Sequence, residues 1–159
     1  RMFGLFKKNQ DSAEGTVAAP VTGKCIAIDQ VADAVFSSKM MGDGFAIVPT
    51  GDTVVAPMDG EIVMIPESKH AFGMQTKDGI ELLVHIGLDT VNLNGQGFEV
   101  LAKQGSRVKA GTPVIRFDRS FMEGQGIDLT TMLVFTGGYD KPVVLSCEGQ
   151  TVNAGDKVL

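Results

Sequence analysis

Two different sequence motifs each occur twice in this chain of 159 residues. Residues 17–28, VAAPVTGKCIAI, and residues 54–65, VVAPMDGEIVMI, share the pattern V-x-A-P-x-x-G-x-x-x-x-I. Residues 105–114, GSRVKAGTPV, and residues 149–158, GQTVNAGDKV, share the pattern G-x-x-V-x-x-G-x-x-V. Glycine readily supplies the positive φ of a tight turn, and valine packs well between strands. The repeats therefore predict duplicated hairpin units in a fold built from two related halves.

Short runs rich in Val, Ile and Phe alternate with turn residues along most of the chain, which has 20 glycines and 6 prolines. No long helical periodicity interrupts them, and this pattern is typical of an antiparallel β-sandwich or barrel. We therefore expect an all-β fold with short helical turns at 29–35 and 119–123. The predicted strands are 17–19, 24–28, 45–48, 53–56, 61–65, 71–76, 80–86, 98–101, 113–117, 132–136 and 142–146.

The start of the chain differs from the rest. Residues 1–16 are mostly polar and lack periodicity after the run MFGLFKK at 2–8. Such a segment is typical of a flexible terminus, which leaves 17–159 as one expected domain. Residues 2–8 place apolar groups beside two lysines, a combination that favours weak peripheral contact with an anionic membrane surface.

Composition narrows the function classes. The net charge is −5 and no cluster of Lys and Arg is present, which argues against nucleic-acid binding and favours a partner with a positive rim. We see no apolar run of membrane-spanning length and no secretory signal, so we expect a cytoplasmic protein. Cys25 and Cys147 are far apart in sequence and in no CxxC spacing, which favours two buried thiols over a disulfide.

Both histidines of the chain lie in strand-like runs. In IELLVHIGLDT, residues 80–90, strand alternation predicts one face made by Glu81, Leu83 and His85 and an opposite face made by Leu82, Val84 and Ile86. Gly87 then leaves space beside the imidazole. A core histidine that donates to a backbone carbonyl is the alternative interpretation.

The second histidine, His70, follows Ser68 by two residues, which puts both on the same side of an extended chain. The hydroxyl of Ser68 can therefore hydrogen-bond the His70 ring and select its tautomer. If neighbouring strands bring His70 and His85 together, one neutral imidazole can attack phosphorus while the other donates to the developing charge. The pair thus favours phosphoryl transfer.

Four sequence blocks carry a resemblance to a known family. They are SSKMMGDGFAIVPT (37–50), VVAPMDGEI (54–62), SKHAFGMQTKDGIELLVHIGLDTVNLNGQGF (68–98) and GSRVKAGTPV (105–114). Together they resemble the glucose-type enzyme IIA component of the phosphoenolpyruvate-dependent sugar phosphotransferase system, over roughly residues 17 to 158.

The resemblance implies that His85 accepts a phosphoryl group on Nε2 from the phosphohistidine of the carrier protein HPr. His85 would then pass the group to a cysteine of a IIB domain, which serves sugar uptake. His70 would hydrogen-bond the phosphoryl oxygens and Ser68 would orient His70. No cofactor is expected, and no GxxxxGK[ST] loop for a nucleotide occurs.

The same resemblance implies a docking rim around the histidines. Its apolar members are Val35, Phe36, Met40, Met41, Phe72, Ile86 and Leu88, although Met40 and Phe72 also suit an ordinary core. Asp33 and Asp89 match acidic positions that flank this rim and would attract a basic surface of HPr. Family members also regulate other proteins through their phosphorylation state, so regulatory targets are further candidate partners. The choice of sugar belongs to the IIC membrane partner.

Three alternatives remain open from the residues themselves. A zinc peptidase needs three protein ligands, whereas only two histidines exist, so zinc at His70 and His85 would be an accessory site. A biotin or lipoyl carrier is suggested by the hairpin repeats and by Lys39-Met40, although Ser38 stands where such a carrier has methionine. A pure binding module is the third alternative.

Overall fold

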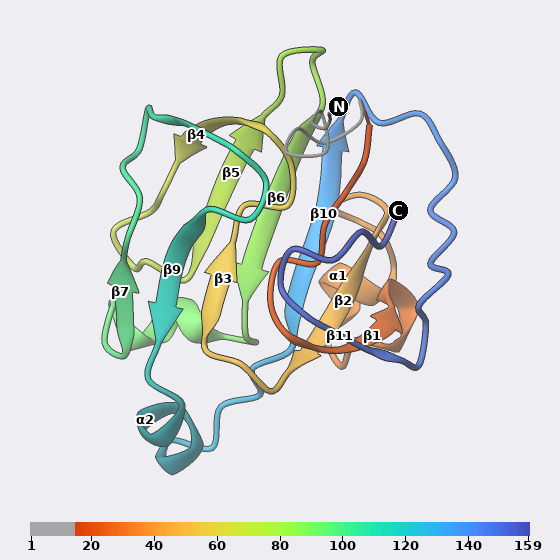
Figure 1. Ribbon diagram of the computed structural model, residues 1–159. Helices are drawn as coiled ribbons and strands as arrows, with labels where there is room; N and C mark the ends of the chain where they lie inside the picture. The colour runs from red at the N-terminus through yellow and green to blue at the C-terminus, as the bar shows by residue number, and fades with distance from the viewer. Residues whose placement is uncertain (1–14) are drawn as a thin grey trace.

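Two antiparallel sheets packed face to face make up the computed structural model, which describes residues 15–159 (Figure 1). In the larger sheet of this described part the order is β11 (Thr151–Val152), β1 (Gly23–Ala27), β2 (Gly44–Pro49), β10 (Thr131–Gly137), β6 (Glu81–Ile86), β5 (Ala71–Gln75), β4 (Gly60–Met64) and β8 (Arg107–Val108). In the smaller sheet it is β3 (Thr53–Val55), β9 (Pro113–Phe117) and β7 (Phe98–Val100). The fold is thus a sandwich rather than a closed barrel, as the sequence predicted in outline.

Copies of the two repeated motifs occupy equivalent places at the two ends of the larger sheet, which supports the duplication. Gly23 of β1 pairs with Val152 of β11, and Gly60 of β4 pairs with Val108 of β8, so each copy of the first motif pairs with one copy of the second in the same register. The symmetry continues inward, where β2 and β10 correspond to β5 and β6. The sheet is therefore two related halves joined between β6 and β10.

The repeated glycines serve two different purposes. Those of the second motif have positive φ, for example +91° at Gly105 and +82° at Gly149, as expected for turns. Those of the first motif lie inside strands. A Cβ on Gly23 would lie 2.2 Å from the carbonyl oxygen of Val48, and one on Gly60 would lie 2.6 Å from that of Gln75. Glycine is needed there because a neighbouring strand passes too close for a side chain.

The main core fills the space between the two sheets. Strand alternation sends one set of side chains inward from the large sheet, and the small sheet covers them from the other side. Phe45, Ile47, Val84, Ile115 and Phe117 are among the buried members. Each such side chain stabilises the fold by roughly 1.5–3 kcal/mol relative to an exposed one.

A second, smaller apolar cluster lies on the outer face of the large sheet. Here η2 (Ile28–Gln30) and α1 (Ala34–Ser37) place Ile28, Val31 and Phe36 against Ala46, Met132 and Val134. The carboxylate of Asp33 caps α1 by accepting a hydrogen bond from the backbone N–H of Val35 at 2.9 Å. The cap starts this short helix at Ala34, and the helix holds Phe36 over the sheet.

The structure corrects several predicted elements. Residues 142–146 form no strand, because Pro142 lacks a backbone donor and Val144 is 72% exposed instead of packed. Residues 17–19 make only an isolated bridge, between Ala18 and Lys157. The predicted helical turn at 29–35 is divided between η2 and α1, whereas the turn at 119–123 is α2 (Arg119–Gly124).

Three short elements were not predicted as such. These are η3 (Thr90–Leu93) and the two-residue strands β8 and β11.

Residues 1–14, which include the proposed membrane-contacting run 2–8, lie outside the described residues. Between residues 15 and 159, no helix combines the length and the apolar character that crossing a membrane requires.

Candidate functional site

The two imidazoles lie against each other at one end of the β5–β6 hairpin. Ala71 of β5 pairs with His85 of β6, and the backbone N–H of Ile86 donates to the carbonyl oxygen of His70 at 2.7 Å. This pairing brings His70 beside the end of β6. The ring centroids of His70 and His85 are 4.8 Å apart, with the rings almost perpendicular at 82°. The structure therefore makes one site from two histidines that are 15 positions apart in sequence.

His85 stands on the outer face of the large sheet. The burial pattern of β6 alternates as the sequence predicted, with Leu82, Val84 and Ile86 buried inside and His85 half-buried outside. The Phe36 ring contacts the imidazole, at a centroid separation of 5.1 Å and an angle of 54°. The small cluster under α1 thus forms one wall of the site and shields part of the ring from water.

A backbone carbonyl determines the tautomer of His85. Its Nδ1 lies 2.9 Å from the carbonyl oxygen of Gly87. Because a carbonyl only accepts hydrogen bonds, Nδ1 must carry the proton, which leaves a lone pair on Nε2 of the neutral ring. The backbone-bonded histidine that the sequence suggested as an alternative is therefore compatible with a nucleophilic role.

Gly87 is the residue that permits this contact. Its φ is +78°, and a Cβ at this position would lie 2.6 Å from Cγ2 of Thr90 and 3.1 Å from the carbonyl oxygen of Asp128. The turn is held from the other side by backbone bonds from Gly87 N to Thr130 O and from Leu88 N to Asp128 O, each 2.9 Å. The carbonyl that orients His85 thus belongs to a tightly packed turn.

The side chains of Ser68 and His70 lie within hydrogen-bond distance of each other. The Ser68 Oγ lies 2.7 Å from Nδ1 of His70. Lys69 between them has a φ of +60°, and its N–H donates to the carbonyl oxygen of Pro66 at 2.9 Å in a turn. When the serine hydroxyl donates to Nδ1, the proton of the neutral ring lies on Nε2, which then becomes a donor.

Burial favours the neutral form of both rings. Burial, reinforced by the neighbouring His70, lowers the pKa of His85 to about 4, although the Gly87 carbonyl and the carboxylates of Asp33 and Asp89 act in the opposite direction. Burial also lowers the pKa of His70. At neutral pH both imidazoles are therefore uncharged, and Nε2 of His85 is free to act as a nucleophile.

Three of the seven apolar residues predicted for the rim are exposed. Val35, Met40 and Met41 on and after α1 are 42%, 76% and 36% exposed, and Leu88 is half-buried beside the small cluster. Asp33 is half-buried at the start of α1, whereas Asp89 is exposed and has a φ of +59°. Phe36 lies almost wholly beneath the surface, so it acts through its contact with His85.

The assignment of Phe72 and Ile86 to the rim is wrong. Both are 0% exposed and belong to the main core between the sheets. Ile86 follows His85 by one residue and so points to the opposite face, and Phe72 pairs with Val84 on that same inner face. These two side chains support the site from below and are not available to a partner.

Two further apolar residues have the exposure expected of the rim. Leu83 lies two positions before His85 on the same face of β6 and is half-buried, and Val91 on η3 is 51% exposed. Strand alternation could have found Leu83. Val91 could have been suspected only as an apolar residue in the polar run that follows Asp89.

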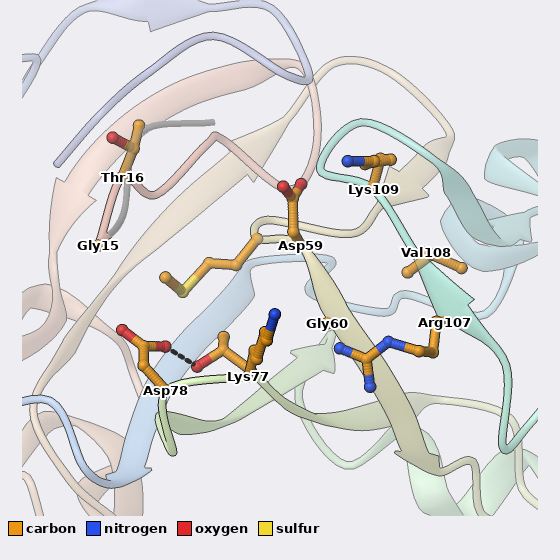
Figure 2. Close-up of a pocket in the computed structure, with 11 residues that line it drawn as sticks. Gly15, Thr16, Asp59, Gly60, Lys77, Asp78, Arg107, Val108 and Lys109 are labelled. Atoms are coloured by element: carbon orange, nitrogen blue, oxygen red, sulfur yellow. Dashed lines mark hydrogen bonds between the residues drawn. The ribbon is translucent and has the colours of Figure 1, made fainter. Parts of the chain in front are cut away.

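A cavity lies at the other end of the same hairpin. Its volume is about 700 Å³, and Lys77 and Asp78 in the β5–β6 turn, Asp59 before β4, and Arg107 and Lys109 at β8 line it (Figure 2). The Asp59 carboxylate accepts from the N–H of Ala110, and that of Asp78 accepts from the Thr76 hydroxyl. No imidazole reaches this cavity, so it is separate from the histidine pair.

A metal centre is not apparent in the part of the chain that the structure describes. No group of three or more His, Cys, Asp and Glu side chains there is arranged to hold an ion. His70 and His85 alone fall one ligand short of the three that a catalytic zinc site requires. An accessory zinc would need a further ligand from another molecule.

The comparisons with known proteins decide between the remaining alternatives. The model of the family "phosphoenolpyruvate-dependent sugar phosphotransferase system, EIIA 1" matches residues 15–140. The chain belongs to this family. It is 40% identical to the glucose-specific EIIA component of Haemophilus influenzae, over 100% of this chain and 94% of that protein. A solved structure of the glucose permease IIA of Mycoplasma capricolum superimposes with a TM-score of 0.82 at 40% identity, covering 90% of this chain and 92% of that one.

A third relative shows another domain arrangement. The chain is 42% identical to the glucoside-specific EIICBA component of Staphylococcus carnosus, of which it spans 21% of the length. The protein is thus a phosphotransferase component that corresponds to the EIIA part of such proteins. It acts through a phosphohistidine, as a phosphocarrier between HPr and a IIB domain in a sugar phosphotransferase system. This membership rules out the biotin carrier and the zinc peptidase as the principal function.

Proposed function

We propose that His85 is the residue of this phosphocarrier that becomes phosphorylated, on Nε2. The observation that carries the proposal is the hydrogen bond from Nδ1 of His85 to the Gly87 carbonyl, which leaves Nε2 as the unprotonated atom. In the transfer, a bond forms between this Nε2 and phosphorus as the bond from phosphorus to the donor nitrogen of HPr breaks. No proton has to leave His85, because its lone pair is already free.

His70 stabilises the phosphoryl group in this proposal. Its ring stands edge-on to His85, and with Ser68 donating to Nδ1 its Nε2 carries the proton and is a hydrogen-bond donor. A donor placed where negative charge develops is most effective in a site with little water. Ser68 is a positioning residue, because it acts through the His70 ring and not on phosphorus.

The low pKa of His85 suits a residue that passes its phosphoryl group on more than one that retains it. An imidazole with a pKa of about 4 is a weak base and therefore a good leaving group from phosphorus. Asp33 and Asp89 lie close enough to affect its charge, and they also repel an added dianion. Both features make the phosphorylated state ready to transfer its group to the IIB cysteine.

Docking of both partners is assigned to the exposed rim. Val35, Met40 and Met41 are exposed on and after the helix whose Phe36 contacts His85, Leu88 is half-buried three positions after His85, and methionine adapts to partners of different shape. Such a surface also excludes water from the phosphohistidine during transfer. Asp33 and Asp89 steer a basic partner toward it. This role calls for a cytoplasmic location, and regulatory targets, if they bind this face, would compete with HPr.

Reconstituted phosphorylation tests the proposal directly. The chain is incubated with phosphoenolpyruvate, enzyme I and HPr, and the acid-labile phosphate is mapped by mass spectrometry under alkaline conditions. Phosphate on His85 is the expected result. Phosphate on His70, or none on either histidine while HPr is fully phosphorylated, would contradict the assignment. Zinc content after purification without chelator tests the accessory metal in parallel.

A further inference from the structure

The two cysteines of the chain meet in the folded protein. Cys25 lies on β1 and Cys147 in the turn before β11, and their Sγ atoms are 2.7 Å apart although 122 positions separate them in sequence. Both are thiols, and both are buried, at 0% and 8% exposure. The sequence correctly predicted buried thiols but held no sign that they are neighbours.

The backbone around the pair is held in register by hydrogen bonds. The N–H of Cys25 donates to the carbonyl oxygen of Gln150 at 2.9 Å, and the N–H of Gly149 donates to the carbonyl oxygen of Cys25 at 2.8 Å. A further bond from Gln150 N to Cys147 O, at 2.8 Å, closes the turn that carries Cys147. The sulfur atoms are therefore adjacent because two paired segments place them so.

From this geometry we propose that Cys25 and Cys147 are a redox modification site, which a small-molecule disulfide such as oxidised glutathione converts to an intramolecular disulfide. The thiolate of Cys147 attacks one sulfur of glutathione disulfide and releases one glutathione thiolate. The thiolate of Cys25 then attacks the Cys147 sulfur and releases the second. The two thiol protons end on the two glutathione molecules, so one disulfide is reduced as another forms.

The environment makes this oxidation slow and ordered. Cys147 reacts first because a trace of its surface is exposed, whereas Cys25 is completely enclosed. Burial, with the neighbouring Cys147, raises the pKa of Cys25 to about 12. Because the thiolate is the reactive form, the second step accelerates as the pH rises.

The disulfide would join the C-terminal segment to β1, the strand that leads to the helix beside His85. β1 leads directly through η2 to α1, which carries Phe36 against His85. β11 is an edge strand held to β1 by only two paired residues on each side. The cross-link closes a long loop, so it raises the melting temperature by on the order of 10 °C.

Oxidation of the folded chain tests this inference. The purified protein is incubated at pH 8.5 with oxidised glutathione, and thiols are then counted in denaturant and peptides mapped without reduction. The expected result is loss of both thiols, a peptide containing Cys25 linked to Cys147, a mass lower by two hydrogens, and a rise in melting temperature that dithiothreitol reverses. The variants Cys25→Ser and Cys147→Ser each keep one thiol and should show no reversible rise in melting temperature.

Three outcomes would overturn it. These are persistence of both thiols in the folded protein while the denatured chain is oxidised, stable glutathione adducts without an internal bond, and disulfides that link only separate chains. Phosphorylation of reduced protein serves as the control for folding of the serine variants, because the cysteines do not touch the histidine pair.

Discussion

The ring of His70 stands edge-on to the ring of His85, and their centroids are 4.8 Å apart. One ring has its Nδ1 bonded to a carbonyl and the other has its Nδ1 bonded to a hydroxyl. In the proposed mechanism this difference separates their roles, since His85 presents a lone pair at Nε2 and His70, when Ser68 donates to its Nδ1, presents a proton there.

Replacing each histidine by alanine should separate these roles. His85→Ala should abolish acceptance of phosphate from phospho-HPr, because no nucleophilic nitrogen remains. His70→Ala should retain partial acceptance but slow transfer to the IIB domain by about 10²–10³-fold, since one stabilising donor is lost. Rapid-quench measurements of both half-reactions distinguish the two, and complete loss of acceptance in both variants would show that the roles are assigned wrongly.

The serine beside His70 allows a finer test. Ser68→Ala removes the 2.7 Å hydrogen bond and should slow onward transfer about tenfold, roughly the effect of one hydrogen bond. Ser68→Thr keeps the hydroxyl and should restore the rate. NMR of the His70 ring nitrogens should report a changed tautomer only in the alanine variant. Equal rates in all three proteins would remove Ser68 from the mechanism.

The low pKa of His85 predicts that the fold becomes less stable in acid. Its ring should titrate near pH 4 by NMR instead of near 6.5, whereas in the unfolded chain the same ring takes up its proton near 6.5. Between these values the unfolded state binds more protons. The free energy of unfolding should therefore be highest above pH 6.5 and fall as the pH decreases toward 4, by at most about 3 kcal/mol from this group.

The matched control for that pH dependence is His85→Gln, which does not titrate. Its free energy of unfolding should fall less than that of the parent between pH 6.5 and 4. Parallel curves for the two proteins in denaturant titrations would show that the ring is not buried as neutral imidazole.

The two aspartates can be tested without disturbing the backbone. Asp33→Asn keeps an oxygen that accepts from the N–H of Val35, and Asp89→Asn suits the left-handed φ of +59°. Removing these charges should slow association with HPr severalfold at about 0.01 M salt and hardly at all near 1 M, where charges are screened. The charge reversal Asp89→Lys should give a larger effect, and salt-independent rates would exclude steering.

The turn after His85 offers a comparison of two glycines. Gly87→Ala should destabilise the fold by on the order of 3 kcal/mol and slow phosphorylation, because a Cβ collides with Thr90 while φ is positive. Gly79→Ala has a similar φ of +92° but nothing within 4 Å, so it should cost only about 1 kcal/mol and leave phosphorylation unchanged. Equal effects on phosphorylation would argue against positioning of His85 by the Gly87 carbonyl.

Much of this arrangement could be predicted from residue patterns. Alternation in β6 identified the face of His85, and the repeats identified the two halves. The close approach at Gly23 and Gly60 was not predicted, because it depends on how strands from distant parts of the chain pack. Ile86 and Phe72 were misassigned because the resemblance supplied a surface role that the alternation argument, applied to the same strands, would have rejected. The meeting of Cys25 and Cys147 depends on the pairing of β1 with β11, which the separate sequence segments do not reveal.

The two-fold order of the large sheet has a consequence for the site. In one half His85 pairs with Ala71, and at the corresponding place in the other half Val134 pairs with Gly44 beneath Phe36. The position equivalent to His85 is thus occupied by Val134, which is buried in the cluster that contains Phe36 of α1. The two equivalent positions thus carry different side chains, an imidazole in one half and buried hydrocarbon in the other, and the half without the imidazole contributes Phe36 as a wall of the site.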